Sequence, residues 1–332
     1  MKSAPNLAGL LERFFTDRLM TQRRVSPNTI ASYRDTFHLL LEFAQRRLRK
    51  NPSALVLADL DVALIGAFLD DLEQSRGVTV RTRNLRLTAI RSFFQFAAYQ
   101  DPTSSAQIQQ VLSIPSKRHD RRLVGYLTRT EIEALLAVPN LRTWDGRRDR
   151  AFLMMAIQTG LRLSEMTALR RSDIELGRGP HVRCLGKGRK ERSTPLTAQM
   201  VNVLKLWLQE PVRGALDLLF PNIHGGRMSA DAVQYLVGKH TAAARRKCPT
   251  LKDKHVSPHL MRHTAAMELL QSGVEPTVIA LWLGHESIKT TQIYLDAHLV
   301  LKEAALAKMA PINAIPGRLK PDDNLLQFLK SL

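Results

Sequence analysis

The chain has 332 residues, enough for two domains that each bury a hydrophobic core. Lysine and arginine total 49 against 30 acidic residues, and the formal net charge of +19 favours a polyanionic partner such as DNA over a soluble protein that is merely basic. Aromatic residues make up only 6%, which argues against base stacking on exposed rings as the main mode of binding.

The cysteines and the apolar segments indicate the cellular compartment. Cys184 and Cys248 lie far apart and form no CxxC pair, so we expect neither a disulfide framework nor a cysteine zinc site. The longest apolar stretch, residues 151–157, is too short to span a bilayer, and the N-terminus lacks the pattern of a signal peptide. These features predict a cytoplasmic, nucleoid-associated protein that does not contact a membrane.

Clear helix punctuation marks residues 1–112, which we expect to form a helical DNA-binding domain. Ser26 is a candidate N-cap followed by a proline, and apolar residues then recur at helical spacing as far as Leu48. A second apolar stripe begins at Val62, and a further helix is predicted after Thr79.

That further helix carries several basic residues and little acid in its first half. They are either a solvated face or contacts to DNA phosphates, and the pattern favours neither interpretation. The residues are Arg81, Arg83 and Arg86.

A basic stretch that contains a proline separates the two expected domains. Residues 113–127 are predicted to be a linker, with the domain boundary near residue 123, and Lys117 and Arg118 are candidates for contacts along a DNA backbone. A capping-box pattern that starts at Thr128 then predicts the first helix of a second domain, residues 128–332.

The second domain is predicted to be mainly α-helical with a small antiparallel β-sheet. Residues 181–185 and 191–195 have the pattern of two strands, joined by a turn rich in glycine and cations. Further helices are expected at 152–159, 198–208, 230–246, 258–272 and 276–283.

The segment Thr159-Gly-Leu-Arg-Leu-Ser-Glu places Arg162 at the start of a helix. A cation is disfavoured there unless an anion shares the site, and a bound phosphate would supply one. Glu165, one turn later, can orient the guanidinium. The alternative is an ordinary surface ion pair between these two residues.

The turn of residues 186–190 presents cations between two strands but is not a P-loop, because a strand follows it and no Ser or Thr follows the lysine. A lysine at such a tip is suited to enter a groove and donate a proton. Lys187 and Lys190 are both candidates, and Lys187 is favoured by its place in Gly-Lys-Gly. Arg189 and Lys190 are candidate DNA contacts.

The segment Pro-His259-Leu-Met-Arg262-His263 opens a helix. Because His259 and Arg262 are three residues apart, they share one helix face, where a proton carrier lies beside a group that binds phosphate bidentately. One alternative is a structural histidine cap. Another is a metal pair formed with His263, but no third ligand has suitable spacing, so no metal is expected.

Leu-Gly284-His285 ends a helix and exposes a second histidine, and Tyr294 follows nine residues later. A lone tyrosine beside an apolar helix is more often a core residue than a nucleophile. Together with the arginines and the lysine, however, it completes a set that can cut a phosphodiester without a metal, because the set includes a nucleophile, cations and a proton donor.

The order Arg, Lys, His-x-x-Arg, Gly-His, Tyr resembles that of the tyrosine recombinases, the phage integrase family. The 26 residues from His259 to His285 support the resemblance. So do the phrases TGLRLSE, GKGRKERSTPL, HLMRHTAAMELLQSGV and IALWLGHESIKTTQIY, which are similar to Xer-type and transposon-borne members. The resemblance is strong over most of residues 128–300. The N-terminal region resembles the family's SAM-like core-binding domain more loosely.

The resemblance implies a site-specific recombinase that works through a 3′-phosphotyrosyl intermediate and needs no cofactor, metal or ATP. Tyr294 would be the nucleophile, Lys187 the acid for the 5′-oxygen, and His259 an aid to proton transfer. The six implied catalytic residues are Arg162, Lys187, His259, Arg262, His285 and Tyr294.

The resemblance also implies partners. The protein would bind double-stranded DNA at inverted-repeat sites as a homo-tetramer or as a hetero-tetramer with related recombinases. The apolar segment 324–332 would dock on a neighbouring protomer or on its own domain. A type IB topoisomerase and a non-catalytic DNA-binding protein are the alternatives to a recombinase. Dimer resolution, phage integration and transposition would all use this chemistry.

Overall fold

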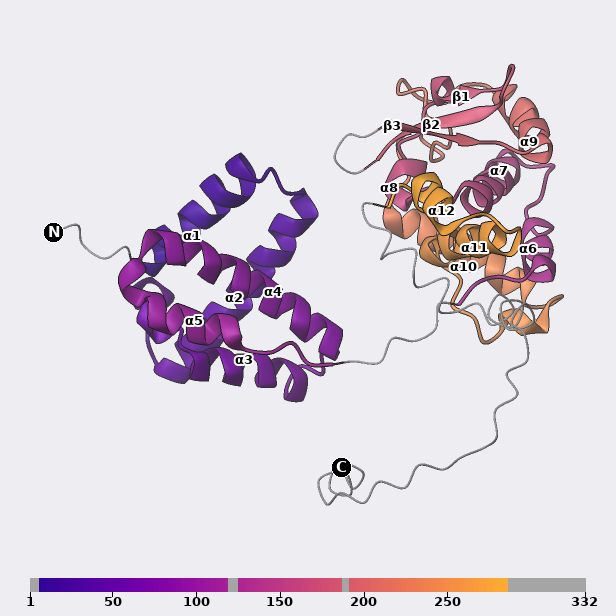
Figure 1. The fold of residues 1–332 in the computed structure, drawn as a ribbon. Helices are drawn as coiled ribbons and strands as arrows, with labels where there is room; N and C mark the ends of the chain where they lie inside the picture. The colour runs from indigo at the N-terminus through magenta and orange to yellow at the C-terminus, as the bar shows by residue number, and fades with distance from the viewer. Residues whose placement is uncertain (1–5, 119–124, 187–190, 286–332) are drawn as a thin grey trace, which may run out of the picture. The chain divides into compact units, whose positions relative to one another are not determined.

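The computed structural model describes residues 6–118, 125–186 and 191–285, and the statements below concern these residues. The chain divides into two compact units, Met1–Arg121 and Arg122–Leu332 (Figure 1). Each unit buries its own hydrophobic core. The expected fold class, mainly α-helical with a small antiparallel sheet in the C-terminal unit, is confirmed.

The N-terminal unit consists of helices around an aromatic core. Its helices are α1 (Leu7–Arg13), a π-helix (Phe14–Gln22), α2 (Pro27–Leu48), α3 (Val62–Gln74), α4 (Val80–Gln100) and α5 (Ser105–Ser113), with short 3-10 turns at Pro52–Ala54, Leu57–Asp59 and Pro102–Ser104. The ring of Phe14 lies 6.1 Å from that of Phe37 and 5.5 Å from that of Phe93. As predicted, Ser26 caps α2 by accepting a hydrogen bond from the Thr29 amide.

Of the three α4 arginines considered as candidate phosphate contacts, two bind groups inside this unit. Arg83 is only 5% exposed, and its guanidinium lies 3.7 Å from the carboxylate of Glu73 on α3. Arg86 donates a hydrogen bond of 2.9 Å to the hydroxyl of Thr36 on α2. A solvated face is therefore wrong for Arg83, and Arg81 alone of the three is fully exposed.

The first residues of the predicted linker pack against the N-terminal unit. Ile114 is buried in the core of the N-terminal unit, and its carbonyl accepts a hydrogen bond from Arg91 on α4. Lys117 forms ion pairs with Glu73 and Asp70 of α3. The buried side chain of Ile114 and the ion pairs of Lys117 therefore hold residues 114–117 against the helices.

The C-terminal unit contains the sheet and the second set of helices. Its helices are α6 (Arg129–Leu136), α7 (Trp144–Thr159), α8 (Leu163–Met166), α9 (Ala198–Leu208), α10 (Ala230–Ala244), α11 (Pro258–Gln271) and α12 (Pro276–Leu283), with 3-10 turns at Arg171–Asp173 and Pro249–Leu251. Its strands are β1 (Ile174–Glu175), β2 (His181–Leu185) and β3 (Glu191–Pro195). The strands are antiparallel in the order β1-β2-β3, and Val182 pairs with Thr194. Strand β1 was not predicted, because two residues carry no periodicity. Helix α7 is largely buried and packs against α9 and α11.

Helix α7 begins at Trp144, well before the apolar run that predicted it. Its first turns contain Arg148 and Asp149, both buried. The Asp149 carboxylate accepts hydrogen bonds from the Arg148 guanidinium and lies 2.8 Å from Nε2 of His240 on α10. Charged residues that precede the apolar run of residues 152–159 are thus part of the interior. Across the described ranges, every helix is too short or too polar to serve as a membrane span.

Candidate active site

The end of α7 and the start of α8 position Arg162. Gly160 ends α7 in the left-handed conformation with φ of +62°, and Arg162 is the N-cap residue of α8. Glu165 accepts a 2.7 Å hydrogen bond from the backbone N–H of Arg162 and a 3.0 Å bond from its Nη1. The expected contact is therefore present, and a buried carboxylate offsets the cost of a cation at a helix N-terminus.

The first turn of α11 carries the second arginine. Ser257 caps the helix, so the alternative of a histidine cap does not hold. Arg262 is 5% exposed and donates hydrogen bonds of 2.6 Å to the carbonyl of Gly160 and 2.7 Å to that of Leu283. These bonds join α11 to the ends of α7 and α12.

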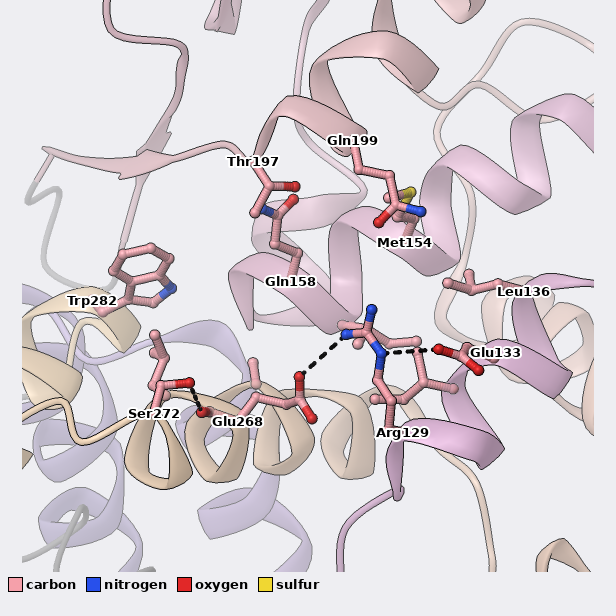
Figure 2. Close-up of a pocket in the computed structure, with 14 residues that line it drawn as sticks. Arg129, Glu133, Leu136, Met154, Gln158, Thr197, Gln199, Glu268, Ser272 and Trp282 are labelled. Carbon is pink, nitrogen blue, oxygen red and sulfur yellow. Dashed lines mark hydrogen bonds and ion pairs between the residues drawn. The ribbon is translucent and has the colours of Figure 1, made fainter.

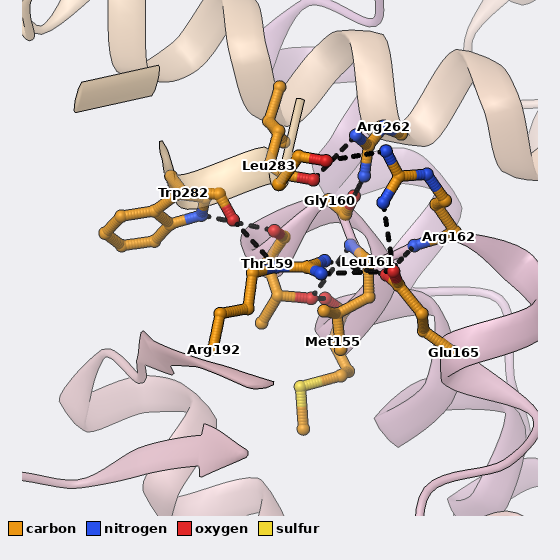
Figure 3. A network of polar contacts seen from close by, with 11 residues as sticks. Met155, Thr159, Gly160, Leu161, Arg162, Glu165, Arg192, Arg262, Trp282 and Leu283 are labelled. Carbon is orange, nitrogen blue, oxygen red and sulfur yellow. Dashed lines mark hydrogen bonds and ion pairs between the residues drawn. The ribbon is translucent and has the colours of Figure 1, made fainter. Parts of the chain in front are cut away.

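The end of α12 completes the junction. Gly284 ends this helix in the left-handed conformation with φ of +65°, as the sequence predicted, and His285 follows it. The Gly284 carbonyl accepts a 2.7 Å hydrogen bond from Nη2 of Arg162. Figure 3 shows Arg162 and Arg262 close to Leu283, the last residue of α12. Three segments far apart in the sequence thus meet at two arginines.

A pocket of about 480 Å³ opens beside these arginines. Arg162, Arg262 and His259 all line it. The remaining lining residues come from α8, α10 and the start of α11: Leu161, Leu163, Ala230, Asp231, Gln234, Ser257 and Pro258. The structure therefore brings three of the six expected catalytic residues to one cavity.

Two histidines of this region are held neutral. Burial, together with the charges of Arg262, Arg162 and Arg192, lowers the pKa of His285 to about 4. Burial, with the charges of His259 and Arg262, lowers the pKa of His263 to about 4. Both imidazoles are therefore uncharged near neutral pH and act there as hydrogen-bonding groups.

The rings of His259 and His263 meet edge to face, with centroids 4.2 Å apart. His259 is exposed and His263 is half-buried. Within the described ranges, no group of three or more His, Cys, Asp or Glu side chains is placed to hold a metal ion.

Sequence reasoning missed Arg192, a third arginine of the same network. It lies on β3 and donates to both carboxylate oxygens of Glu165, at 3.1 Å from Nη1 and 2.7 Å from Nη2. Burial acts to raise the pKa of Glu165, but the hydrogen bonds from Arg192 and Arg162 and the charge of Arg192 outweigh burial and hold that pKa below its usual value. Glu165 is therefore a carboxylate between two arginines. The alternation of inward and outward side chains along β3 was the only local feature that indicated an inward position for Arg192.

Several expected site residues lie outside the described residues. They are Lys187, Arg189, Lys190 and Tyr294. Among the DNA-binding candidates, Arg81, Lys117 and Arg118 are exposed, and Lys117 also forms ion pairs with α3. Arg83 and Arg86 are less exposed and bind groups within the N-terminal unit.

A second pocket, of about 300 Å³, lies apart from the expected catalytic residues. Its lining comes from α6, α7, α9, α11 and α12 and includes Met154 and Trp282 (Figure 2). Arg129 crosses it, 3.1 Å from Glu133 and 3.7 Å from Glu268. It contains none of the six implied catalytic residues.

A pocket with two fixed guanidinium groups and a histidine, in a basic two-unit chain, has the charge and the donors that suit a phosphodiester. Residues 125–299 match the phage integrase family, and residues 11–101 match the N-terminal SAM-like domain of phage integrases. The chain belongs to the phage integrase family and is a tyrosine-type site-specific recombinase, so neither a topoisomerase nor a non-catalytic DNA-binding protein is favoured.

Individual relatives agree with this assignment. The integrase/recombinase y4rC of Sinorhizobium fredii is 58% identical over 332 residues, covering 100% of both chains. Tyrosine recombinase XerD of Yersinia pestis is 33% identical over 291 residues, covering 86% of this chain and 91% of that protein. The fold is similar to that of the XerH site-specific recombinase bound to a palindromic difH substrate, with a TM-score of 0.69 at 23% identity over 86% of this chain and 81% of the other.

Proposed function

We propose that Tyr294 is the nucleophile of this recombinase and that the pocket at Arg162, Arg262 and His259 holds the scissile phosphate. The tyrosine oxygen forms a bond to phosphorus while the bond from phosphorus to the 5′-oxygen breaks. The products are a 3′-phosphotyrosyl link and a DNA strand with a 5′-hydroxyl. Attack by a 5′-hydroxyl on that link reverses the step without ATP. The observation that carries this proposal is the convergence of these three side chains on one cavity.

The two arginines stabilise the negative charge that develops on the non-bridging oxygens. A guanidinium has five N–H donors, and in the described part of the chain Glu165 and Gly284 engage two donors of Arg162. Such contacts hold the group in place before DNA binds, so little reorganisation is needed in the transition state. Arg262, fixed to two backbone carbonyls, is oriented in the same way.

The histidines have separate roles. His259 lines the pocket and is exposed, and in this proposal it takes the proton of the attacking tyrosine. His285, whose pKa is about 4, donates a hydrogen bond to the phosphate as a neutral imidazole. Lys187, with Lys190 as the alternative, protonates the departing 5′-oxygen.

The proposal also covers the DNA substrate and the number of protomers that bind it. We infer binding of double-stranded DNA at inverted repeats, at the nucleoid, by four protomers that are either all copies of this chain or include related recombinases. The net charge of +19 supports DNA binding, as does the DNA-bound state of the similar XerH structure. The exposed residues Arg81, Lys117 and Arg118 are the N-terminal candidates for phosphate contacts, with Arg189 and Lys190 as candidates in the C-terminal unit.

A covalent-trapping experiment tests the nucleophile. The protein is incubated with a duplex nicked next to the cleavage site, so that the short cleaved product diffuses away and the protein–DNA adduct accumulates. We expect an adduct that survives denaturation, forms in EDTA, and is absent with Tyr294→Phe. An adduct of undiminished yield with Tyr294→Phe would exclude Tyr294. Relaxation of supercoils by monomers at any sequence would instead favour topoisomerase activity.

A further inference from the structure

Arg192 contacts the catalytic region from the sheet. Its side chain is 13% exposed, and besides its two contacts with Glu165 its Nε lies 3.3 Å from the carbonyl oxygen of Trp282 (Figure 3). One arginine therefore joins β3 to α8 and to the last turn of α12. Because Arg192 is not among the residues that line the 480 Å³ pocket, it is placed to act through its neighbours.

We propose that Arg192 is a positioning residue for DNA cleavage, which holds Glu165 so that this carboxylate fixes the guanidinium of Arg162. The inference rests on the proposed function of Arg162 as a phosphate ligand. The arrangement is a relay in which Arg192 binds Glu165, and Glu165 binds Arg162.

The geometry explains why Glu165 needs a second cation. Its side chain is 4% exposed, so an unmatched carboxylate would be costly there. Arg162 is 31% exposed and contacts the carboxylate through a single guanidinium nitrogen. Arg192, in contrast, uses two nitrogens on both carboxylate oxygens, which fixes the plane of the carboxylate. Arg192 thereby sets the direction in which Glu165 accepts from Arg162.

The turn at Gly284 shows how closely Arg192 is packed. A Cβ atom at Gly284 would lie 2.8 Å from Nη1 and 3.0 Å from Cζ of Arg192. The carbonyl of the same glycine accepts the second hydrogen bond of Arg162. Arg192 therefore binds one anchor of Arg162, the carboxylate of Glu165, and packs closely against the residue that carries the other, Gly284.

A double-mutant cycle tests the relay. Single-turnover cleavage of the nicked substrate, at saturating protein, is measured for Arg192→Gln, Glu165→Gln and the double variant. We expect Arg192→Gln to slow cleavage by about 100-fold, the loss typical of a misplaced catalytic group. The double variant should be no slower than the slower single variant, because both changes break one relay. Wild-type cleavage by Arg192→Gln, or losses that multiply in the double variant, would overturn the proposal.

A modified substrate separates loss of the proposed relay from loss of folded protein, because less folded protein would slow cleavage of both substrates equally. Replacing one non-bridging oxygen of the scissile phosphate by methyl removes the charge that Arg162 neutralises. The defect of Arg192→Gln, relative to wild type, should therefore shrink at least tenfold on the methylphosphonate. An equal defect on both substrates would show that Arg192 does not act through Arg162.

Two further variants serve as controls. Arg183→Gln removes an exposed arginine from β2 of the same sheet and should cleave at the wild-type rate. Arg192→Lys keeps the charge but cannot contact both oxygens of Glu165, so it should still cleave DNA slowly. This variant also keeps the proposal testable if Arg192→Gln fails to fold. Full activity of Arg192→Lys would overturn the geometric argument. If the wild-type protein forms no adduct, the proposed function itself is refuted. If the wild type is active and only the relay tests fail, the relay alone is refuted.

Discussion

The guanidinium of Arg262 donates a 2.6 Å hydrogen bond to the carbonyl oxygen of Gly160, 102 residues earlier in the chain. That carbonyl belongs to the residue that ends α7, and the chain turns there toward Arg162. The second bond of Arg262, to Leu283, reaches the end of α12. One buried arginine thus ties together the backbone on both sides of the proposed phosphate site.

Gly160 should not tolerate a side chain. Its φ of +62° costs an L-residue about 1–2 kcal/mol. A Cβ there would also lie 2.6 Å from Leu283 and 3.0 Å from Ala265, and such overpacking costs about 1–3 kcal/mol more. We expect Gly160→Ala to lower the free energy of unfolding by the sum of these two costs, as measured by urea denaturation. Gly179→Ala is the control, because its φ is +73° but no atom lies within 4 Å. Equal losses in the two variants would contradict the packing argument.

Arg262→Lys should fold and bind DNA but cleave slowly. A lysine keeps the charge, yet its single ammonium cannot contact the carbonyls of Gly160 and Leu283 and still bind phosphate bidentately. Loss of one preformed donor to a transition-state oxyanion costs about 100- to 1,000-fold in rate. Single-turnover cleavage at saturating protein measures this loss, and DNA affinity is measured separately. A cleavage rate within threefold of wild type would show that Arg262 is not needed at the phosphate.

Stability should fall as the pH drops from about 6.5 toward 4. Burial and nearby cations lower the pKa values of His263 and His285 to about 4 from 6.5. In this window the unfolded chain binds more protons than the folded one, so the free energy of unfolding decreases with falling pH. His263→Gln should reduce the difference in that free energy between pH 7 and pH 5, as measured in urea. His224→Gln, at an exposed site, is the matched control. An unchanged difference for His263→Gln would contradict the prediction.

Asp149 is expected to be a main electrostatic anchor of the C-terminal unit. Its side chain is 4% exposed and contacts Arg148 and His240, both at 2.8 Å. Removing one partner of a buried ion pair costs about 3–5 kcal/mol, so Asp149→Ala should lower the free energy of unfolding by that amount. Asp145→Ala is the control, because Asp145 is 53% exposed and 4.0 Å from Arg148. Similar unfolding midpoints for the two variants would show that Asp149 stabilises the unit no more than Asp145 does.

Deletion of residues 322–332 should weaken assembly on DNA. The apolar segment 324–332 lies outside the described residues, and its docking on a neighbouring protomer remains a prediction. If it docks in this way, the truncated protein binds a single site normally but forms fewer paired complexes on native gels. Unchanged pairing would favour docking within one protomer.

Local patterns in the sequence determined most of the helices. Ser26 and Thr128 were readable as caps, and Gly160 and Gly284 as helix ends, because these residues satisfy backbone groups within one turn. The spacing of His259 and Arg262 likewise placed both on the first turn of a helix. Such features depend on neighbours a few residues away, so a sequence contains them directly.

Only the tertiary structure decided which charged side chains are buried and which partners they contact. Arg83 and Arg192 resemble surface residues in the sequence, yet their partners, Glu73 and Glu165, come from other elements. The start of α7 was missed because the carboxylate of Asp149 is buried against Arg148 and against His240 on another helix. A buried charge is stable only when folding supplies its counter-charge, and that partner has no fixed distance along the chain.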